Sequence, residues 1–183
     1  MILFHTGLQE IPQPDIRYGR KNADFGQGFY LSPDREFACR WAKEREDRSS
    51  ILNIYDLDEK DLRIKSLQRD EEWFSYIFAN RHGQPDMFAE YDVITGPIAN
   101  DTLYDTMGIL TSGFLSGSEA LAILRLGAEY MQWAVKSEKA LAQLRWLRAD
   151  ILPKDKTASY RKTVQEEEKN FQELLAAKLQ SFE

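Results

Sequence analysis

The segment Asp24–Ser32, which reads DFGQGFYLS, carries the strongest structural signal in the chain. Gly26 and Gly28 lead into a run of apolar and aromatic residues, and this order predicts a tight turn followed by a strand. Gly28 and Tyr30 lie two residues apart, so they face the same side of that strand. Such a strand can bring its backbone close to a flat ligand and stack an aromatic ring on it. The pattern also fits an ordinary strand with Tyr30 in the core.

The rest of the chain predicts an α+β domain, because strands and helices follow each other without a strict β-α-β rhythm. Strands are expected where β-branched and aromatic residues gather or alternate with polar ones: residues 2–5, 28–31, 51–57, 91–95 (closed by Gly96-Pro97) and 129–136. In the last of these, Met131, Trp133 and Val135 share one face, and Gln132 lies on the other. We expect one domain over residues 1–150.

Helices are expected after residues that can cap a first helical turn. These residues are Ser32, Asn100 or Asp101, Ser116 to Ser118, and Ser137. A further helix is expected where Asp70-Glu71-Glu72 place acidic residues in a first turn. The helix after Ser32 is expected to bury Trp41. The helix after Ser137 is expected to continue through Leu147, because its apolar residues follow helical spacing.

A charged segment follows Pro153 and is expected to form a separate amphipathic helix within residues 151–183. Its apolar residues form one stripe, which consists of Phe171, Leu174, Leu175, Leu179 and Phe182. Such a stripe needs a surface to pack against. Docking on its own domain, homodimer formation and binding of a cognate inhibitor protein are the three alternatives.

The composition narrows the classes of function. The 183 residues carry a net charge of -6, which argues against a general affinity for nucleic acid phosphates. The single cysteine, Cys39, excludes an internal disulfide, and with only two histidines no zinc site of the usual spacing can be drawn. No metal is therefore expected. No stretch has the length of a membrane span or the pattern of a secretory signal, so we expect a cytoplasmic protein without membrane contact.

Three polar residues near the predicted strands can carry chemistry. His5 ends the first strand, where it is either a residue at the edge of the core or a neutral ring that donates to a ribose hydroxyl. Arg20 and Arg81 are either solvated charges or bidentate ligands of a pyrophosphate. None of the three is diagnostic alone, and their order around Gly26 and Tyr30 is more specific than any one of them.

Several segments together resemble the ADP-ribosyltransferase superfamily of the His-Tyr-Glu type and, more narrowly, the bacterial family DUF3990. They are Leu3–His5, Arg20–Ser32, Asn80–Arg81, Tyr91–Asp101 and Gln132–Leu141. The resemblance covers about residues 1–147, and the second segment is its most specific part.

The resemblance implies two small, roughly perpendicular β-sheets flanked by helices, with NAD as co-substrate bound between them. His5 would hold the adenosine ribose, and Tyr30 would stack on the nicotinamide ring. Backbone near Thr6 and Gly7 would pair with the nicotinamide amide. The catalytic residues would be His5, Tyr30 and Gln132. The NAD-binding residues would be His5, Thr6, Gly7, Arg20, Gly26, Gly28, Phe29, Tyr30 and Arg81.

The chain departs from the superfamily pattern at two positions. Thr6 follows the histidine where Gly is usual, which alters the nicotinamide contact. Gln132 stands where Glu is usual, judged by its spacing to Ser137–Leu141. A Glu accepts a hydrogen bond from the nicotinamide ribose and stabilises the cationic sugar, whereas Gln accepts the bond but brings no charge. Catalysis would then be weaker, or Glu129 or Glu138 would assist it.

These features predict an enzyme, an NAD-dependent ADP-ribosyltransferase that acts as a bacterial intracellular toxin or effector on a protein or nucleic acid acceptor. It would release nicotinamide through an oxocarbenium-like state. NAD hydrolysis differs from this only in that water is the acceptor. The alternative is a non-catalytic module that binds NAD, ADP-ribose or a partner protein, because Gln132 lacks the charge of a carboxylate.

Overall fold

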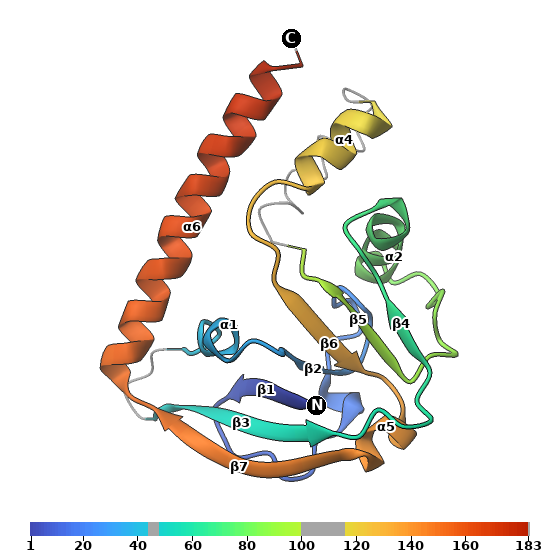
Figure 1. Ribbon diagram of the computed structural model, residues 1–183, viewed down its shortest axis with the longest axis vertical. Coiled ribbons are helices and arrows are strands. Elements are labelled where there is room, and N and C mark those ends of the chain that lie inside the picture. Colours follow the sequence, from blue (N-terminus) through green and yellow to red (C-terminus); the bar gives the residue numbers. More distant parts are fainter. Residues whose placement is uncertain (44–47, 100–115, 183) are drawn as a thin grey trace.

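The computed structural model describes residues 1–43, 48–99 and 116–182 (Figure 1). The helix expected after Asn100 or Asp101 lies outside these residues. The strands are β1 (Ile2–Gly7), β2 (Phe29–Leu31), β3 (Ser50–Leu57), β4 (Ile64–Ser66), β5 (Val93–Pro97), β6 (Met131–Val135) and β7 (Leu144–Leu152). The helices are α1 (Arg35–Cys39), α2 (Glu71–Arg81), α4 (Gly117–Leu124), α5 (Glu138–Ala142) and α6 (Lys154–Gln180), with a 3-10 turn at Ile16–Tyr18.

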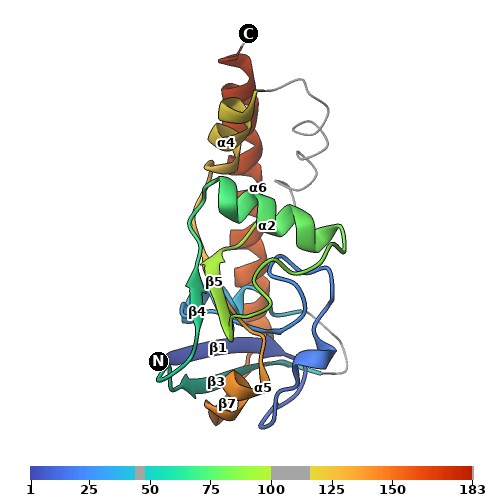
Figure 2. The same ribbon diagram turned by 90° about the vertical axis from the view of Figure 1, so that its right-hand side faces the viewer.

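The strands form two small sheets, which confirms the predicted α+β class. One sheet has the order β1-β3-β7 and is antiparallel. The other has the order β2-β6-β5-β4, and in it only β4 and β5 run parallel. The strands of the two sheets cross at a steep angle (Figures 1 and 2). In the described residues, a single isolated antiparallel bridge joins them, between Phe4 and Ser32.

Two apolar clusters cover the two faces of the four-stranded sheet. The first fills the space between the sheets and includes Leu3, Phe29, Tyr55, Trp133 and Val135. The second lies on the opposite face, beneath α2, and includes Phe25, Trp73, Tyr76, Ile94 and Ala134. Because Trp133 and Val135 belong to one cluster and Ala134 to the other, the alternation predicted for this strand is confirmed.

The helix expected to start at Ser32 starts later and is shorter. The backbone N–H and C=O of Ser32 are both hydrogen bonded to Phe4, at 2.9 Å each, so Ser32 belongs to the sheet. Asp34 caps the helix instead, because its side chain accepts the N–H of Phe37 at 3.1 Å. Since α1 ends at Cys39, the expected burial of Trp41 is wrong, and its side chain is 59% exposed.

The segment Leu144–Leu152 was expected to continue a helix, and this expectation is wrong. The helix capped by Ser137 ends at Ala142, and β7 follows it at once. The register between β3 and β7 shifts at Ile54 and Tyr55, which face Arg148 and Trp146, so Leu147 is an extra residue in the strand. A bulge of this kind interrupts the alternation of a strand, and the apolar spacing then imitates that of a helix.

Two smaller differences concern the four-stranded sheet. Its β4 was not expected, since three residues with little apolar content carry almost no strand signal. Gly96-Pro97 was expected to end a strand, but β5 runs through both residues and Pro97 lies opposite Met131. The helix expected from Asp70 to His82 is confirmed as α2, which Asp70 caps through the N–H of Trp73 at 3.0 Å.

The C-terminal helix α6 rises from the end of β7 along one side of the molecule (Figure 1). Phe171 and Leu175 of its apolar stripe are buried in the cluster beneath α2, whereas Leu174 is 49% exposed. Glu167 accepts hydrogen bonds at 2.7 Å from Arg40 and from the hydroxyl of Tyr130. Within residues 1–43, 48–99 and 116–182, no helix is long and apolar enough to cross a membrane.

Candidate functional site

The two sheets part immediately after the bridge between Phe4 and Ser32. The N–H and C=O of Phe4 point to β2, whereas the C=O of Met1 accepts a bond from Leu57 at the end of β3. Neighbouring residues of an extended strand point their backbone groups to opposite sides, so even-numbered residues of β1 face β2 and odd-numbered ones face β3. The N–H and C=O of Thr6 therefore face β2, with which β1 has no pairing beyond Phe4 in the described chain.

Thr6 is held in this orientation by its own side chain. The hydroxyl donates to the carbonyl of Ala38, at the end of α1, with an oxygen-to-oxygen distance of 2.6 Å. The backbone groups of Gly7 face β3 by the same alternation. Of the two residues expected to offer backbone groups to a ligand, Thr6 is thus the one whose groups are turned away from the β1–β3 ladder.

His5 bridges β1 and β2 through its ring. Its Nδ1 lies 2.8 Å from the carbonyl oxygen of Tyr30, and its ring centroid is 4.6 Å from that of Phe29. A carbonyl only accepts, so Nδ1 carries the proton and Nε2 of the neutral ring is an acceptor. With Nδ1 bound to Tyr30, the neutral ring offers Nε2 as an acceptor to a ribose hydroxyl, and the expected contact of His5 with the ribose remains a prediction. A Cβ on Gly7 would lie in van der Waals contact with Nε2, at 3.6 Å, so Gly7 borders this atom.

The pH dependence of stability reports on the partly buried ring of His5. Burial lowers the pKa of His5 below its usual value of 6.5, while the bond to Tyr30 opposes this in part. The unfolded chain then binds more protons than the folded one below about pH 6.5, so stability is full above that pH and falls as the pH drops towards the lowered pKa. Between pH 7.5 and 5.5, urea denaturation should show the wild type losing up to about 1 kcal/mol more than His5→Gln. Identical losses of stability in the wild type and in His5→Gln would contradict this role of His5.

Tyr30 presents a ring fixed by its hydroxyl. The hydroxyl donates to the carbonyl of Gly26 at 2.7 Å and accepts the N–H of Phe25 at 2.9 Å. Burial raises the pKa of Tyr30 well above its usual range, so the hydroxyl stays protonated. The ring itself is partly exposed and packs against the cluster beneath α2. Tyr30 is therefore suited to stacking and not to proton transfer.

The glycines before Tyr30 are accounted for by packing of the chain on itself. Gly26 has a φ of 74°, which favours glycine. A Cβ on Gly28 would lie 2.8 Å from the carbonyl oxygen of Val135, and one on Gly19 would lie 2.1 Å from that of Gly28. Phe29 is buried between the sheets. The expected contacts of Gly26, Gly28 and Phe29 with NAD remain predictions.

Gln132 lies near Tyr30 on the same face of the sheet. Tyr30 is opposite Ala134 of β6, and Gln132 precedes Ala134 by two residues. Diagonal neighbours of this kind are roughly 7–8 Å apart between Cα atoms, within reach of long side chains. Tyr30 and Gln132 thus share the face of the four-stranded sheet that lies beneath α2, whereas the ring of His5 packs on Phe29 of the cluster between the sheets. The convergence of His5, Tyr30 and Gln132 on one ligand remains a prediction.

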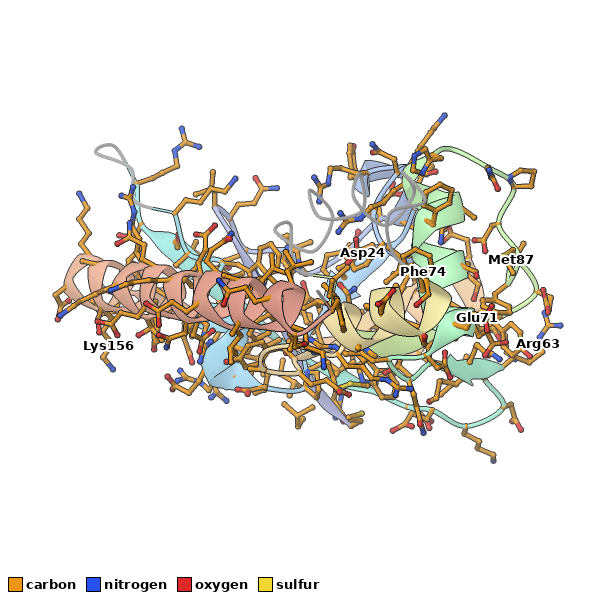
Figure 3. All side chains as sticks on the ribbon, turned by 90° about the horizontal axis from the view of Figure 1, so that it is seen from above. Asp24, Arg63, Glu71, Phe74, Met87 and Lys156 are labelled. Atoms are coloured by element: carbon orange, nitrogen blue, oxygen red, sulfur yellow. The ribbon has the colours of Figure 1, made fainter. Side chains whose placement is uncertain are left out.

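Asp24 is a charged residue of this region that the sequence analysis did not single out. It lies beside α2 (Figure 3), where its Oδ1 accepts from Nε and Nη2 of Arg81 at 2.7 and 2.5 Å. Its Oδ2 accepts from the N–H of Ala99 at 3.0 Å and from Nε2 of Gln132 at 3.4 Å. The sequence feature that could have pointed to Asp24 is its place within the Asp24–Ser32 segment, directly before the glycine turn.

A family model described as "Protein of unknown function (DUF3990)" matches residues 1–146. The chain belongs to the DUF3990 family. The expected resemblance to DUF3990 is thus confirmed, and the match ends inside β7, so α6 lies outside it. No curated protein is significantly similar to the chain.

The other charged residues of the expected site in this DUF3990 protein, two arginines and two glutamates, differ in their exposure and in their partners. Arg20 is exposed. Arg81 is taken up by Asp24 and by the carbonyl of Ala99 at 3.2 Å. Their assignment to a pyrophosphate remains a prediction. Glu129 and Glu138 are exposed, and the carboxylate that contacts Gln132 is that of Asp24.

Proposed function

We propose that this DUF3990 protein is an NAD-dependent ADP-ribosyltransferase, which cleaves nicotinamide from NAD and transfers ADP-ribose to a macromolecule. The observation that carries the proposal is the backbone of Thr6, whose N–H and C=O face away from the β1–β3 ladder next to His5 and Tyr30. A primary amide such as that of nicotinamide has one acceptor and two donors, so it can pair with both groups at once.

The proposal gives each neighbouring side chain a role that its geometry allows. The Nε2 atom of His5 accepts a hydrogen bond from a ribose hydroxyl, because Nδ1 is bound to the carbonyl of Tyr30. The ring of Tyr30 stacks on the nicotinamide ring. As the glycosidic C–N bond breaks, nicotinamide leaves with the bonding electrons and positive charge develops on the ribose. Gln132 accepts a hydrogen bond from a hydroxyl of that ribose.

The arrangement of the two sheets also supports the proposal of an ADP-ribosyltransferase. Two small sheets that cross steeply and that, in the described part of the chain, part after the bridge between Phe4 and Ser32 agree with the pair of sheets that the resemblance implies. In this proposal NAD binds where β1 and β2 part, and the protein acts inside a bacterial cell on a protein or nucleic acid acceptor. Its acidic net charge of -6 favours a local contact with that acceptor over broad phosphate binding.

The direct test is incubation of the full chain with NAD and measurement of nicotinamide release by chromatography. We expect release by the wild type and a loss of roughly 100- to 1000-fold in kcat for Gln132→Ala, as for removal of one group that stabilises developing charge. Gln172→Ala on the exposed side of α6 is the matched control and should keep wild-type kcat. Absence of release from the wild type, with candidate acceptors supplied, would rule the proposal out.

The second candidate function is a non-catalytic module that binds NAD or ADP-ribose. The observation that favours it is the neutral side chain of Gln132, which brings no charge to stabilise a cationic sugar. Calorimetry separates the two functions, because a module binds NAD without releasing nicotinamide. Release by the wild type would eliminate this candidate.

A further inference from the structure

Gln132 can serve as a hydrogen-bond acceptor only if its amide is turned the right way. The end of a glutamine side chain has an oxygen that accepts and an NH₂ group that donates, and rotation about the last bond exchanges their positions. A hydroxyl approaching the wrong end meets a donor. A neighbouring hydrogen-bonding group must therefore fix one orientation of the amide.

Asp24 makes this selection possible. Its Oδ2 lies 3.4 Å from Nε2 of Gln132, and an ionised carboxylate accepts hydrogen bonds but donates none. Only the NH₂ group of Gln132 can face it, so Oε1 is turned to the opposite side of the amide. Gln132 is 108 residues away in sequence, and this contact exists only because β6 lies beside the segment before β2.

The carboxylate of Asp24 is itself held from two other elements. Arg81, at the end of α2, binds Oδ1, and both side chains of this ion pair are 12–13% exposed. The N–H of Ala99, after β5, binds Oδ2 at 3.0 Å, and Asn80 donates to the backbone carbonyl of Asp24 at 3.1 Å. Charge-assisted hydrogen bonds from Arg81 to one oxygen and a backbone donor on the other fix both the position and the charge of this carboxylate.

We propose that Asp24 is a positioning residue that turns the amide of Gln132 so that its Oε1 faces the nicotinamide ribose. This inference rests on the proposed transferase function. It also gives a physical reason for glutamine at position 132. A glutamate there would bring a second carboxylate to about 3.4 Å from Asp24, and two adjacent carboxylates oppose each other's ionisation.

The experiment compares D24N, Q132E and the double variant D24N/Q132E, with D150N as the matched control. Asp150 is a carboxylate that pairs with Arg35 and Arg148 at 3.2 Å on the other sheet. Initial rates of nicotinamide release are measured from pH 5 to 9, and thermal melting checks folding. We expect D24N to lower kcat about tenfold with little change in KM for NAD, because an asparagine NH₂ can face Gln132 and reverse its amide.

The pH profile separates positioning from mere structural support. The carboxyl introduced by Q132E should titrate at least about one pH unit above the usual glutamate value while Asp24 is present. In D24N/Q132E the introduced asparagine can donate a hydrogen bond to this carboxyl, so the inflection of the pH profile should return to lower pH. The double variant should therefore have a higher kcat at pH 7 than Q132E. D150N should keep the wild-type profile.

The outcomes distinguish this inference from the proposed function. If the wild type releases nicotinamide but D24N keeps its full kcat, or Q132E has the same profile with and without Asp24, the positioning role is overturned and the function stands. If D24N does not fold, Q132E still tests the inference. An inflection of its pH profile in the ordinary glutamate range overturns the positioning role of Asp24 and leaves the proposed function standing. If the wild type releases no nicotinamide, both fail together.

Discussion

Tyr30→Ala is expected to lower kcat for nicotinamide release by roughly 100-fold or more, the largest kinetic effect of a change outside Gln132. Alanine removes the ring that is proposed to stack on nicotinamide. It also removes the hydroxyl that holds the carbonyl of Gly26 and the N–H of Phe25. The turn next to Asp24 would then lose two of its hydrogen bonds, and the leaving group would lose its platform.

Tyr30→Phe separates the two contributions. The ring remains, so kcat should stay within about tenfold of the wild type, while the free energy of unfolding should fall by about 1–2 kcal/mol for the hydrogen bonds lost. Tyr18→Ala is the matched control, because Tyr18 is 91% exposed in the preceding loop. Nicotinamide release is measured for all three variants and unfolding by urea. Wild-type kcat in Tyr30→Ala would remove Tyr30 from the site.

Lys136→Met is expected to lower the free energy of unfolding by about 3 kcal/mol. The ammonium group of Lys136 contacts the carboxylate of Asp86, the carbonyl of Phe25 and, at 3.0 Å, the hydroxyl of Tyr76. Its side chain is only 7% exposed, and that of Asp86 is 25% exposed. Methionine fills a similar volume, but it leaves a partly buried carboxylate and a carbonyl without their cation.

The control for this prediction is Lys65→Met. Lys65 pairs with Glu72 at 2.8 Å, but Glu72 is 48% exposed, so the expected loss is below about 1 kcal/mol. Urea denaturation followed by circular dichroism gives both values. Equal losses for the two variants would show that the network around Lys136 adds nothing beyond a surface ion pair. Because the network holds the carbonyl of Phe25, Lys136→Met should also disturb the turn before Tyr30.

Much of the fold could be predicted wherever the signal is local. Asp70 followed by two glutamates predicts the start of α2, and the alternation in β6 predicts which face carries Gln132. Elements without a regular local pattern were missed. The bulge at Leu147 hides β7, and β4 has only three residues.

The candidate site likewise contains residues that a local sequence pattern marks and residues that only the fold brings together. His5 and Tyr30 stand out in the sequence because a histidine ends one strand and a glycine turn leads into another. Asp24 does not, because its partners Arg81, Ala99 and Gln132 are 57, 75 and 108 residues away. No local pattern encodes such contacts. The tautomer of His5 likewise depends on a carbonyl 25 residues away.

The sequence alone determines the α+β class, which follows from its periodicity and local turns, and family membership, which follows from the match to the DUF3990 family model. It also marks His5, Tyr30 and Gln132 as candidate site residues. The tertiary structure decides which atoms of those residues are available. It turns the backbone groups of Thr6 away from β3, leaves Nε2 of His5 as an acceptor and sets Asp24 against Gln132. The physical reason is that hydrogen-bond direction depends on which strands lie side by side, and that arrangement comes from burial of both faces of the four-stranded sheet.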